Sequence, residues 1–214
     1  MTSPPELVAV PLPMFPLGGT AFPGSVVPLH IFEPRYRQLI TDLQRGDGRF
    51  GIVLIERGSE VGGGEVRTTI GTRMRVSEAS QFEDGRWAIV AVGEERIRVV
   101  TWLPDDPYPM ALVETPPPGE PPSVEANAMA ESAVRRALDL AAQLGSEVPS
   151  VDDVLVADPQ TRQWQLAALT PAGPADRQRI LEEDSAERRA DVIAAAALDA
   201  AEMFAFELQR RQDG

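Results

Sequence analysis

The first 115 residues alternate between short apolar runs and turn signals, which is the pattern of β-structure. Apolar or alternating segments cover residues 7–17, 25–32, 50–55, 65–80, 87–92, 95–102 and 108–114. Pro23-Gly24 and residues 83–86 favour tight turns, and Gly62-Gly63-Gly64 predicts a hairpin loop. Short strands with frequent turns predict a sheet that curls or closes on itself. Prolines remove ladder donors from residues 7–17, so this segment is expected to be an edge strand or an extended lead-in.

One helix is predicted inside this β-rich part, directly after Phe32. Pro34 suits the first helical position, where its missing N–H would have no intrahelical acceptor. Glu33 and Arg37 are four residues apart and are expected to pair near the helix start. Apolar residues then recur with the spacing of one helical face. This face consists of Tyr36, Leu39, Ile40 and Leu43.

A proline-rich segment, residues 116–123, separates two kinds of sequence. Such a segment is stiff and extended, so we predict a β-rich domain over residues 1–115, a linker over 116–123 and an α-helical subdomain over 124–214. Alanine, leucine, glutamate and arginine dominate after the linker. Helices are predicted there over residues 124–144, 158–168, 175–181 and 185–210. The predicted fold class is α+β.

The composition of the chain mainly excludes classes of binding partner. The 214 residues include 33 acidic and 20 basic side chains, all of the latter arginine, for a formal net charge of -13. Nucleic-acid binders present basic faces, so no nucleic-acid partner is expected. The apolar runs fall short of the roughly 20 residues that a membrane span needs. The N-terminus has no signal-peptide pattern, so we expect no membrane partner and a cytoplasmic location.

Cysteine and lysine are both missing from the sequence. Disulfides, thiolate chemistry, Schiff bases, Ser-Lys dyads and P-loop lysines are therefore impossible within these residues. No cluster of His, Asp and Glu has the spacing of a metal site, so neither a metal nor another cofactor is expected. The serines lack the sequence context of a hydrolase nucleophile. We therefore predict that the chain is not an enzyme.

Residues 28–37, with the sequence Pro-Leu-His-Ile-Phe-Glu-Pro-Arg-Tyr-Arg, concentrate the candidate binding side chains. The candidates are His30, Phe32, Glu33, Arg35, Tyr36 and Arg37. Arginines hold carboxylates through paired hydrogen bonds, so this stretch predicts a polar rim beside an apolar groove. A structural explanation stays open, in which the same side chains cap the helix and pin it to the sheet. Under it His30 is a structural histidine, and Phe32, Phe50 and Phe82 lie in the core.

Three stretches, in matching order and spacing, resemble the Lon N-terminal, or substrate-binding, domain. They are the opening segments Met14–Leu17, Phe22–Gly24 and Pro28–Arg37, then Ile70–Val76, then Val92–Val99. The C-terminal helices are similar to the family's helical subdomain. The resemblance implies a pseudo-barrel of strands with one embedded helix, followed by an α-helical bundle. The chain departs from full Lon proteases, because it ends at Gly214 and has no lysine for a P-loop or a Ser-Lys dyad. It is therefore expected to be a free-standing form without their ATPase and protease modules.

The resemblance and the missing catalytic groups predict a non-catalytic recognition module. It would bind unfolded or degron-like polypeptide segments at a sheet edge or in an apolar groove. Its expected partners are unfolded or partly folded polypeptides, a protease that it serves as an adaptor, or a second copy of the chain. The alternative is a small-molecule binder or hydrolase that uses a cleft between the β and α bodies. An enclosed polar cavity lined by His30, Glu33 and Arg35 would favour that alternative.

Overall fold

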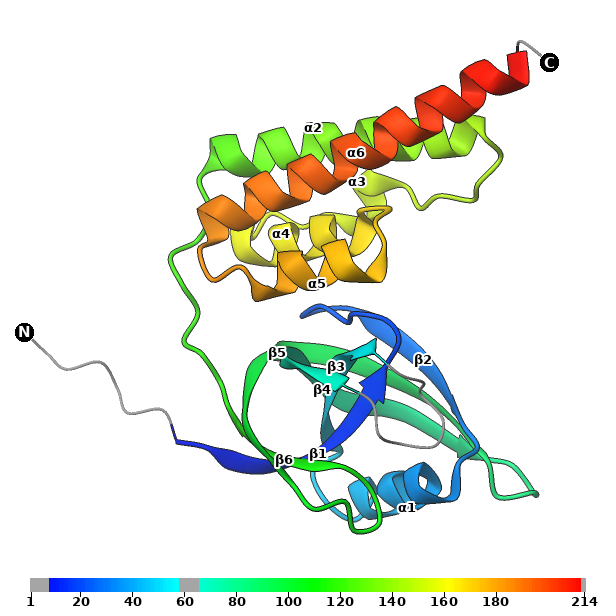
Figure 1. The fold of residues 1–214 in the computed structure, drawn as a ribbon, viewed down its shortest axis with the longest axis vertical. Helices are drawn as coiled ribbons and strands as arrows, with labels where there is room; N and C mark the ends of the chain where they lie inside the picture. Colours follow the sequence, from blue (N-terminus) through cyan, green and yellow to red (C-terminus); the bar gives the residue numbers. More distant parts are fainter. Residues whose placement is uncertain (1–7, 58–65, 213–214) are drawn as a thin grey trace, which may run out of the picture. The chain divides into compact units, whose positions relative to one another are not determined.

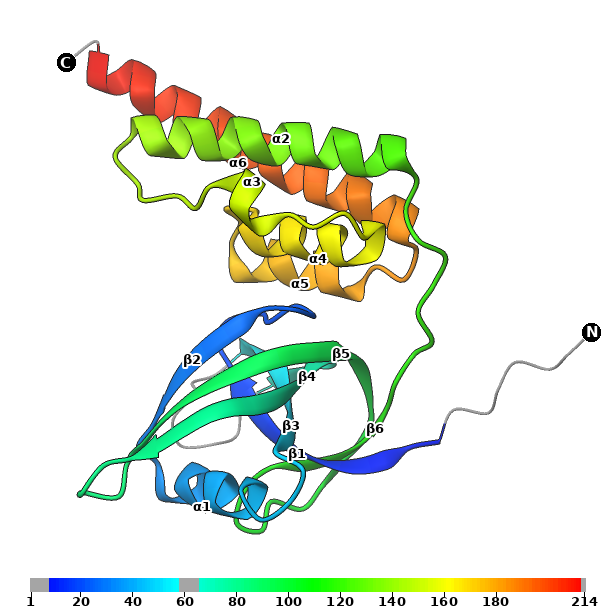
Figure 2. The same ribbon diagram turned by 180° about the vertical axis from the view of Figure 1, so that it is seen from behind.

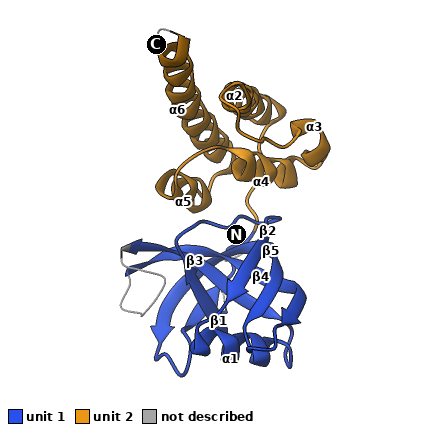
Figure 3. Ribbon diagram, turned by 90° about the vertical axis from the view of Figure 1, so that its right-hand side faces the viewer, with its two compact units in different colours: residues 1–117 blue, residues 118–214 orange. Residues whose placement is uncertain are grey.

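The chain divides into two compact units, residues 1–117 and residues 118–214 (Figure 3). The computed structural model describes residues 8–57 and 66–212 of them. In the described residues, unit 1 is built on a β-sheet and unit 2 on helices, as the sequence predicts. The predicted hairpin loop at Gly62-Gly63-Gly64 lies outside the described residues.

Unit 1 is a sheet that closes into a barrel, with one helix packed against it. Its elements are β1 (Val10–Leu17), β2 (Val26–Ile31), α1 (Pro34–Leu43), β3 (Arg49–Arg57), β4 (Val66–Gln81), β5 (Trp87–Leu103) and β6 (Met110–Glu114). The strand order is β2-β5-β4-β3-β1-β6, and β6 also pairs with β5. That pairing closes β5, β4, β3, β1 and β6 into a ring, while β2 continues the sheet along the first half of β5 (Figures 1 and 2). The predicted pseudo-barrel is confirmed.

β5 is one strand of 17 residues, where the sequence predicted two strands over 87–92 and 95–102. Its pairing with β4 shifts register between Arg73 and Met74, and Glu94 is the extra residue. Such a bulge bends a strand without ending it. The bend lets the first half of β5 pair with β2 and the second half pair with β6.

β1 has partners on both sides, so its predicted place at a sheet edge was wrong. Residues 10–13 pair with β6, and residues 14–17 pair in parallel with β3. The Met14 N–H donates to the Pro109 carbonyl at 2.8 Å, which sets the alternation of backbone groups along β1. The nitrogens of Pro11 and Pro13 therefore point away from β6, and the nitrogen of Pro16 points away from β3. Each proline occupies a position where a missing N–H costs no ladder bond.

The core of unit 1 lies between α1 and the sheet. The predicted apolar face of α1 is buried, at Tyr36, Leu39, Ile40 and Leu43. It packs with buried side chains from β1, β2, β3, β4 and β5, among them Phe15, Ile31, Phe50, Met74 and Trp87. β1 and β2 therefore share one core with α1, through Phe15 and Ile31.

Unit 2 consists of helices, and the four longer ones follow the sequence prediction. They are α2 (Val124–Gln143), α4 (Pro159–Leu169), α5 (Pro174–Glu182) and α6 (Ala186–Gln212), with a single turn, α3 (Val151–Val154), that the sequence did not predict. α2 and α6 run side by side (Figures 1 and 2). In the residues that the structure describes, no helix is long and apolar enough to cross a membrane.

A buried arginine ties α4 to the start of α6. Arg189 is 4% exposed, and its guanidinium lies 4.1 Å from the centroid of the Trp164 ring. It donates to Oε1 of Gln163 at 2.8 Å and to the carbonyl oxygen of Glu183 at 2.7 Å. Nε2 of Gln163 donates in turn to the Ala186 carbonyl at 2.6 Å. Neutral oxygens and an aromatic face thus contact the buried charge.

Candidate functional site

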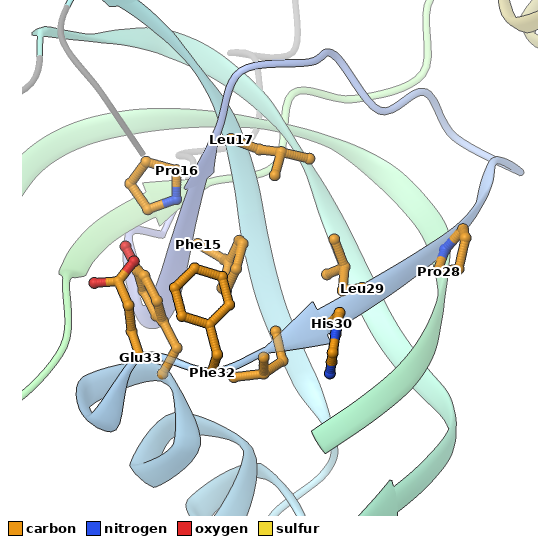
Figure 4. Close-up of a pocket in the computed structure, with 10 residues that line it drawn as sticks. Phe15, Pro16, Leu17, Pro28, Leu29, His30, Phe32 and Glu33 are labelled. Atoms are coloured by element: carbon orange, nitrogen blue, oxygen red, sulfur yellow. The ribbon is translucent and has the colours of Figure 1, made fainter. Parts of the chain in front are cut away.

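A hollow opens in unit 1 between β1 and β2. It encloses about 200 Å³ and is bounded by residues 15–17 of β1, residues 28–33 and Tyr36 (Figure 4). We call it the β1–β2 slot. Its lining is mostly apolar. A cavity of about 150 Å³ lined by such side chains accommodates benzene, so the slot is large enough for one aromatic or long aliphatic side chain.

Aromatic rings form much of the slot. The ring centroids of Phe15 and Tyr36 lie 4.3 Å apart, and both rings are buried. Phe32 lies in the slot lining (Figure 4) but is 54% exposed, and Phe82 is 45% exposed. The prediction that these two phenylalanines lie in the core was therefore wrong, whereas Phe50 is fully buried. An exposed aromatic beside an apolar hollow is typical of a binding surface.

Glu33 pairs with Arg35, not with Arg37 as the spacing predicted. Nε of Arg35 lies 3.1 Å from Oε2 of Glu33, and the two side chains are 19% and 17% exposed. The Arg35 guanidinium also lies 4.5 Å from the centroid of the Tyr36 ring. Glu33 and Tyr36 line the slot and Arg35 does not. Arg35 therefore contacts two lining residues, through an ion pair with Glu33 and through the ring of Tyr36.

Arg37 lies on a different side of α1. It lines a polar hollow with Gln81 and Trp87, and its guanidinium rests against Gly85 in the turn between β4 and β5. In that turn the backbone N–H and the guanidinium of Arg86 lower the pKa of the Asp84 carboxyl, and the charge of Arg37 adds to this effect. The two arginines do not converge on one groove.

His30 is exposed on the outer face of β2, and its ring meets the Phe82 ring edge-on at a centroid distance of 5.7 Å. Leu29 and His30 leave β2 on opposite faces (Figure 4). The slot is not the enclosed polar cavity that would favour a hydrolase, because its lining is mostly apolar and omits Arg35. Across the described ranges, no group of His, Asp and Glu could hold a metal ion.

The chain matches a known domain family over most of its length. The family model of the ATP-dependent protease La (LON) substrate-binding domain covers residues 11–194. The chain belongs to this family. The match includes all of the stretches on which the sequence resemblance rests, as well as the β1–β2 slot. The slot is therefore part of a Lon substrate-binding domain.

Relatives of this Lon substrate-binding domain include larger proteins. A Lon protease from Koribacter versatilis is 28% identical over 192 residues, which is 85% of this chain and 23% of that protein. Lon protease 2 from Myxococcus xanthus is 32% identical over 105 residues, which is 48% of this chain and 13% of that protein. The chain thus spans about a quarter or less of the curated relatives it matches.

Solved structures agree with the fold. The Lon N-terminal domain protein from Xanthomonas campestris aligns with a TM-score of 0.65 at 26% identity, covering 87% of this chain and 98% of that one. The N-terminal domain of a Lon protease from the Mycobacterium avium complex aligns with a TM-score of 0.64, covering 89% of this chain and 99% of that one. The second likeness, at 16% identity, concerns the fold alone.

Proposed function

We propose that this Lon substrate-binding domain is a non-catalytic recognition module that binds unfolded or degron-like polypeptide segments in the β1–β2 slot. The observation that carries the proposal is an apolar slot of about 200 Å³ with the exposed ring of Phe32 in its lining. Folded proteins bury their large apolar side chains, whereas unfolded segments expose them. An apolar slot of this size therefore selects for unfolded chain. The family's description as a substrate-binding domain supports a polypeptide ligand.

In this proposal the domain acts as an adaptor, because recognition and cleavage belong to different parts of the machinery. The 214 residues contain no lysine and no cysteine, so they supply neither a P-loop lysine nor a Ser-Lys dyad. Its role is to hold a segment, and a protease supplies the cleavage. The Lon proteases among its relatives support a protease of this kind as the partner.

Phe32→Ser is expected to weaken peptide binding about tenfold, because an aromatic contact at the slot is lost. The fold should be unaffected, since the ring is more than half exposed. Fluorescence anisotropy with labelled peptides from an unfolded protein measures the change. Val100→Ser is the matched control, because Val100 has the same 54% exposure and lies in the second half of β5. Equal weakening by both variants would place the binding site elsewhere, and a wild-type protein that binds no peptide would end the proposal.

A further inference from the structure

β2 has one edge that no described strand occupies, since β5 is its partner in the sheet. The carbonyl of Ser25 accepts the Gly93 N–H at 2.9 Å just before β2 begins, and Val26 then lies opposite Val92. Antiparallel pairs alternate between bonded and non-bonded. Val27, Leu29 and Ile31 are thus the β2 residues that exchange backbone hydrogen bonds with β5. The backbone groups of Pro28 and His30 point to the opposite edge.

The position of Pro28 is independent evidence for this alternation of backbone groups. A proline inside a sheet takes a position where its nitrogen faces away from the neighbouring strand, and the pairing places the nitrogen of Pro28 at the open edge. Pro28 can offer only its carbonyl there. His30, in the same orientation two residues later, offers both an N–H and a carbonyl. It lies on the stretch of β2 that also lines the slot.

We infer that the segment held by the slot is an extended strand, and that it pairs with the open edge of β2 at His30. The inference rests on the proposed function and adds the binding mode and the kind of segment. A residue paired with His30 places its own side chain on the outer face, because paired residues share a face. Its two neighbours then point inward beside Leu29 and Ile31, toward the slot. The preferred segment therefore carries apolar side chains at two alternate positions.

The charge of the protein limits which polypeptide segments the slot can bind. The slot lining contains the Glu33 carboxylate, and the chain has a formal net charge of -13. Arg35 offsets the charge of Glu33, but the field of the whole chain would still repel an acidic segment. The occupant is thus a neutral or basic polypeptide strand with alternating apolar residues, which pairs through its backbone.

His30→Pro and His30→Ala separate backbone pairing from any role of the imidazole. The probe is a short fluorescein-labelled peptide with alternating phenylalanine and lysine residues. His30→Pro removes the edge N–H, and its ring obstructs an incoming strand, so binding should weaken about tenfold. His30→Ala also lacks the imidazole but keeps the N–H, so it should bind the peptide several-fold more tightly than His30→Pro does. Equal affinities for the two variants would overturn the strand pairing. Because the native Pro28 already occupies an equivalent position, His30→Pro is compatible with the fold.

Amide hydrogen exchange in the wild-type protein gives a second test that needs no variant. Saturation with the peptide should slow exchange of the His30 amide about tenfold or more, because the amide becomes hydrogen-bonded. Peptide binding without protection at His30 would overturn the pairing and leave the proposed function intact. Absence of peptide binding by the wild type would overturn the proposed function itself. A control peptide has the same composition as the probe, but its apolar residues are grouped at one end. It should bind more weakly than the alternating peptide, and equal affinities would contradict the alternating pattern.

Discussion

Gly93→Ala is expected to lower the free energy of unfolding of unit 1 by about 3 kcal/mol. A Cβ at this position would collide with the carbonyl oxygen of Phe22 and approach the nitrogen of Gly24. These are backbone atoms of the turn that leads into β2, and they cannot swing aside as a side chain can. The Gly24 N–H donates to the Gly93 carbonyl at 2.9 Å, and the Gly93 N–H donates to the Ser25 carbonyl at 2.9 Å. Relief of the collision would break these bonds.

Urea denaturation followed by tryptophan fluorescence measures the effect of Gly93→Ala. The control is Gly19→Ala, because an added Cβ at Gly19 meets no atom within 4 Å. That change should alter stability by no more than about 0.5 kcal/mol. Equal stability of the two variants would show that the turn can shift away from β5. Peptide binding should also fall in Gly93→Ala, because the same turn sets where β2 begins.

Arg189→Ala is expected to lower the free energy of unfolding of unit 2 by about 3 kcal/mol, the combined effect of a cavity and orphaned buried acceptors. The guanidinium fills the space against the Trp164 ring, and it satisfies Oε1 of Gln163 and the carbonyl of Glu183. Without it, the buried Oε1 of Gln163 loses this donor, and so does the partly buried carbonyl of Glu183. Lysine is expected to rescue little, because one ammonium cannot reproduce the planar fork of donors.

Arg188→Ala provides the matched control for Arg189→Ala. The neighbouring arginine has a side chain that is 70% exposed and pairs with Glu183 at 3.0 Å on the surface. Exposed ion pairs of this kind contribute about 0–1 kcal/mol. Thermal and urea unfolding monitored by circular dichroism compare the two variants. A similar loss of stability in both would mean that the buried contacts of Arg189 add nothing beyond a surface charge.

Local chemistry was enough to predict most elements of the chain. α1 was predictable because Pro34 begins it and its apolar residues share one face, which is buried as expected. The α2 and α6 boundaries were close to prediction, because long helices repeat their pattern over several turns. β5 was not predictable as one strand, because Gly93-Glu94 has the local appearance of a turn. Its continuity depends on strands on either side of it that are distant in the sequence.

The sequence indicated which segment contributes to the candidate site, but not how its side chains are arranged there. Residues 28–37 do contribute His30, Phe32, Glu33 and Tyr36 to the slot. The opposite wall, Phe15 to Leu17, lies in a stretch that carries the family resemblance, but it was not predicted to face a groove. An apolar run has the same pattern whether it faces a core or a groove. The Glu33 pairing was mispredicted because helical spacing assumes that Glu33 is within the helix. It is extended, with ψ of 135°, and its side chain turns to Arg35 instead.

The sequence by itself determined the strand-rich and helix-rich parts, the place of the embedded helix, and the exclusion of lysine and cysteine chemistry. These depend on residue type and on short spacings, which any reader of the chain can count. Only the tertiary structure decided that β1 changes partners at Met14, that β2 keeps an open edge, and that Arg35 and Arg37 lie apart. Each of these depends on which strand lies alongside which, and closure of the barrel, not local propensity, determines that pairing.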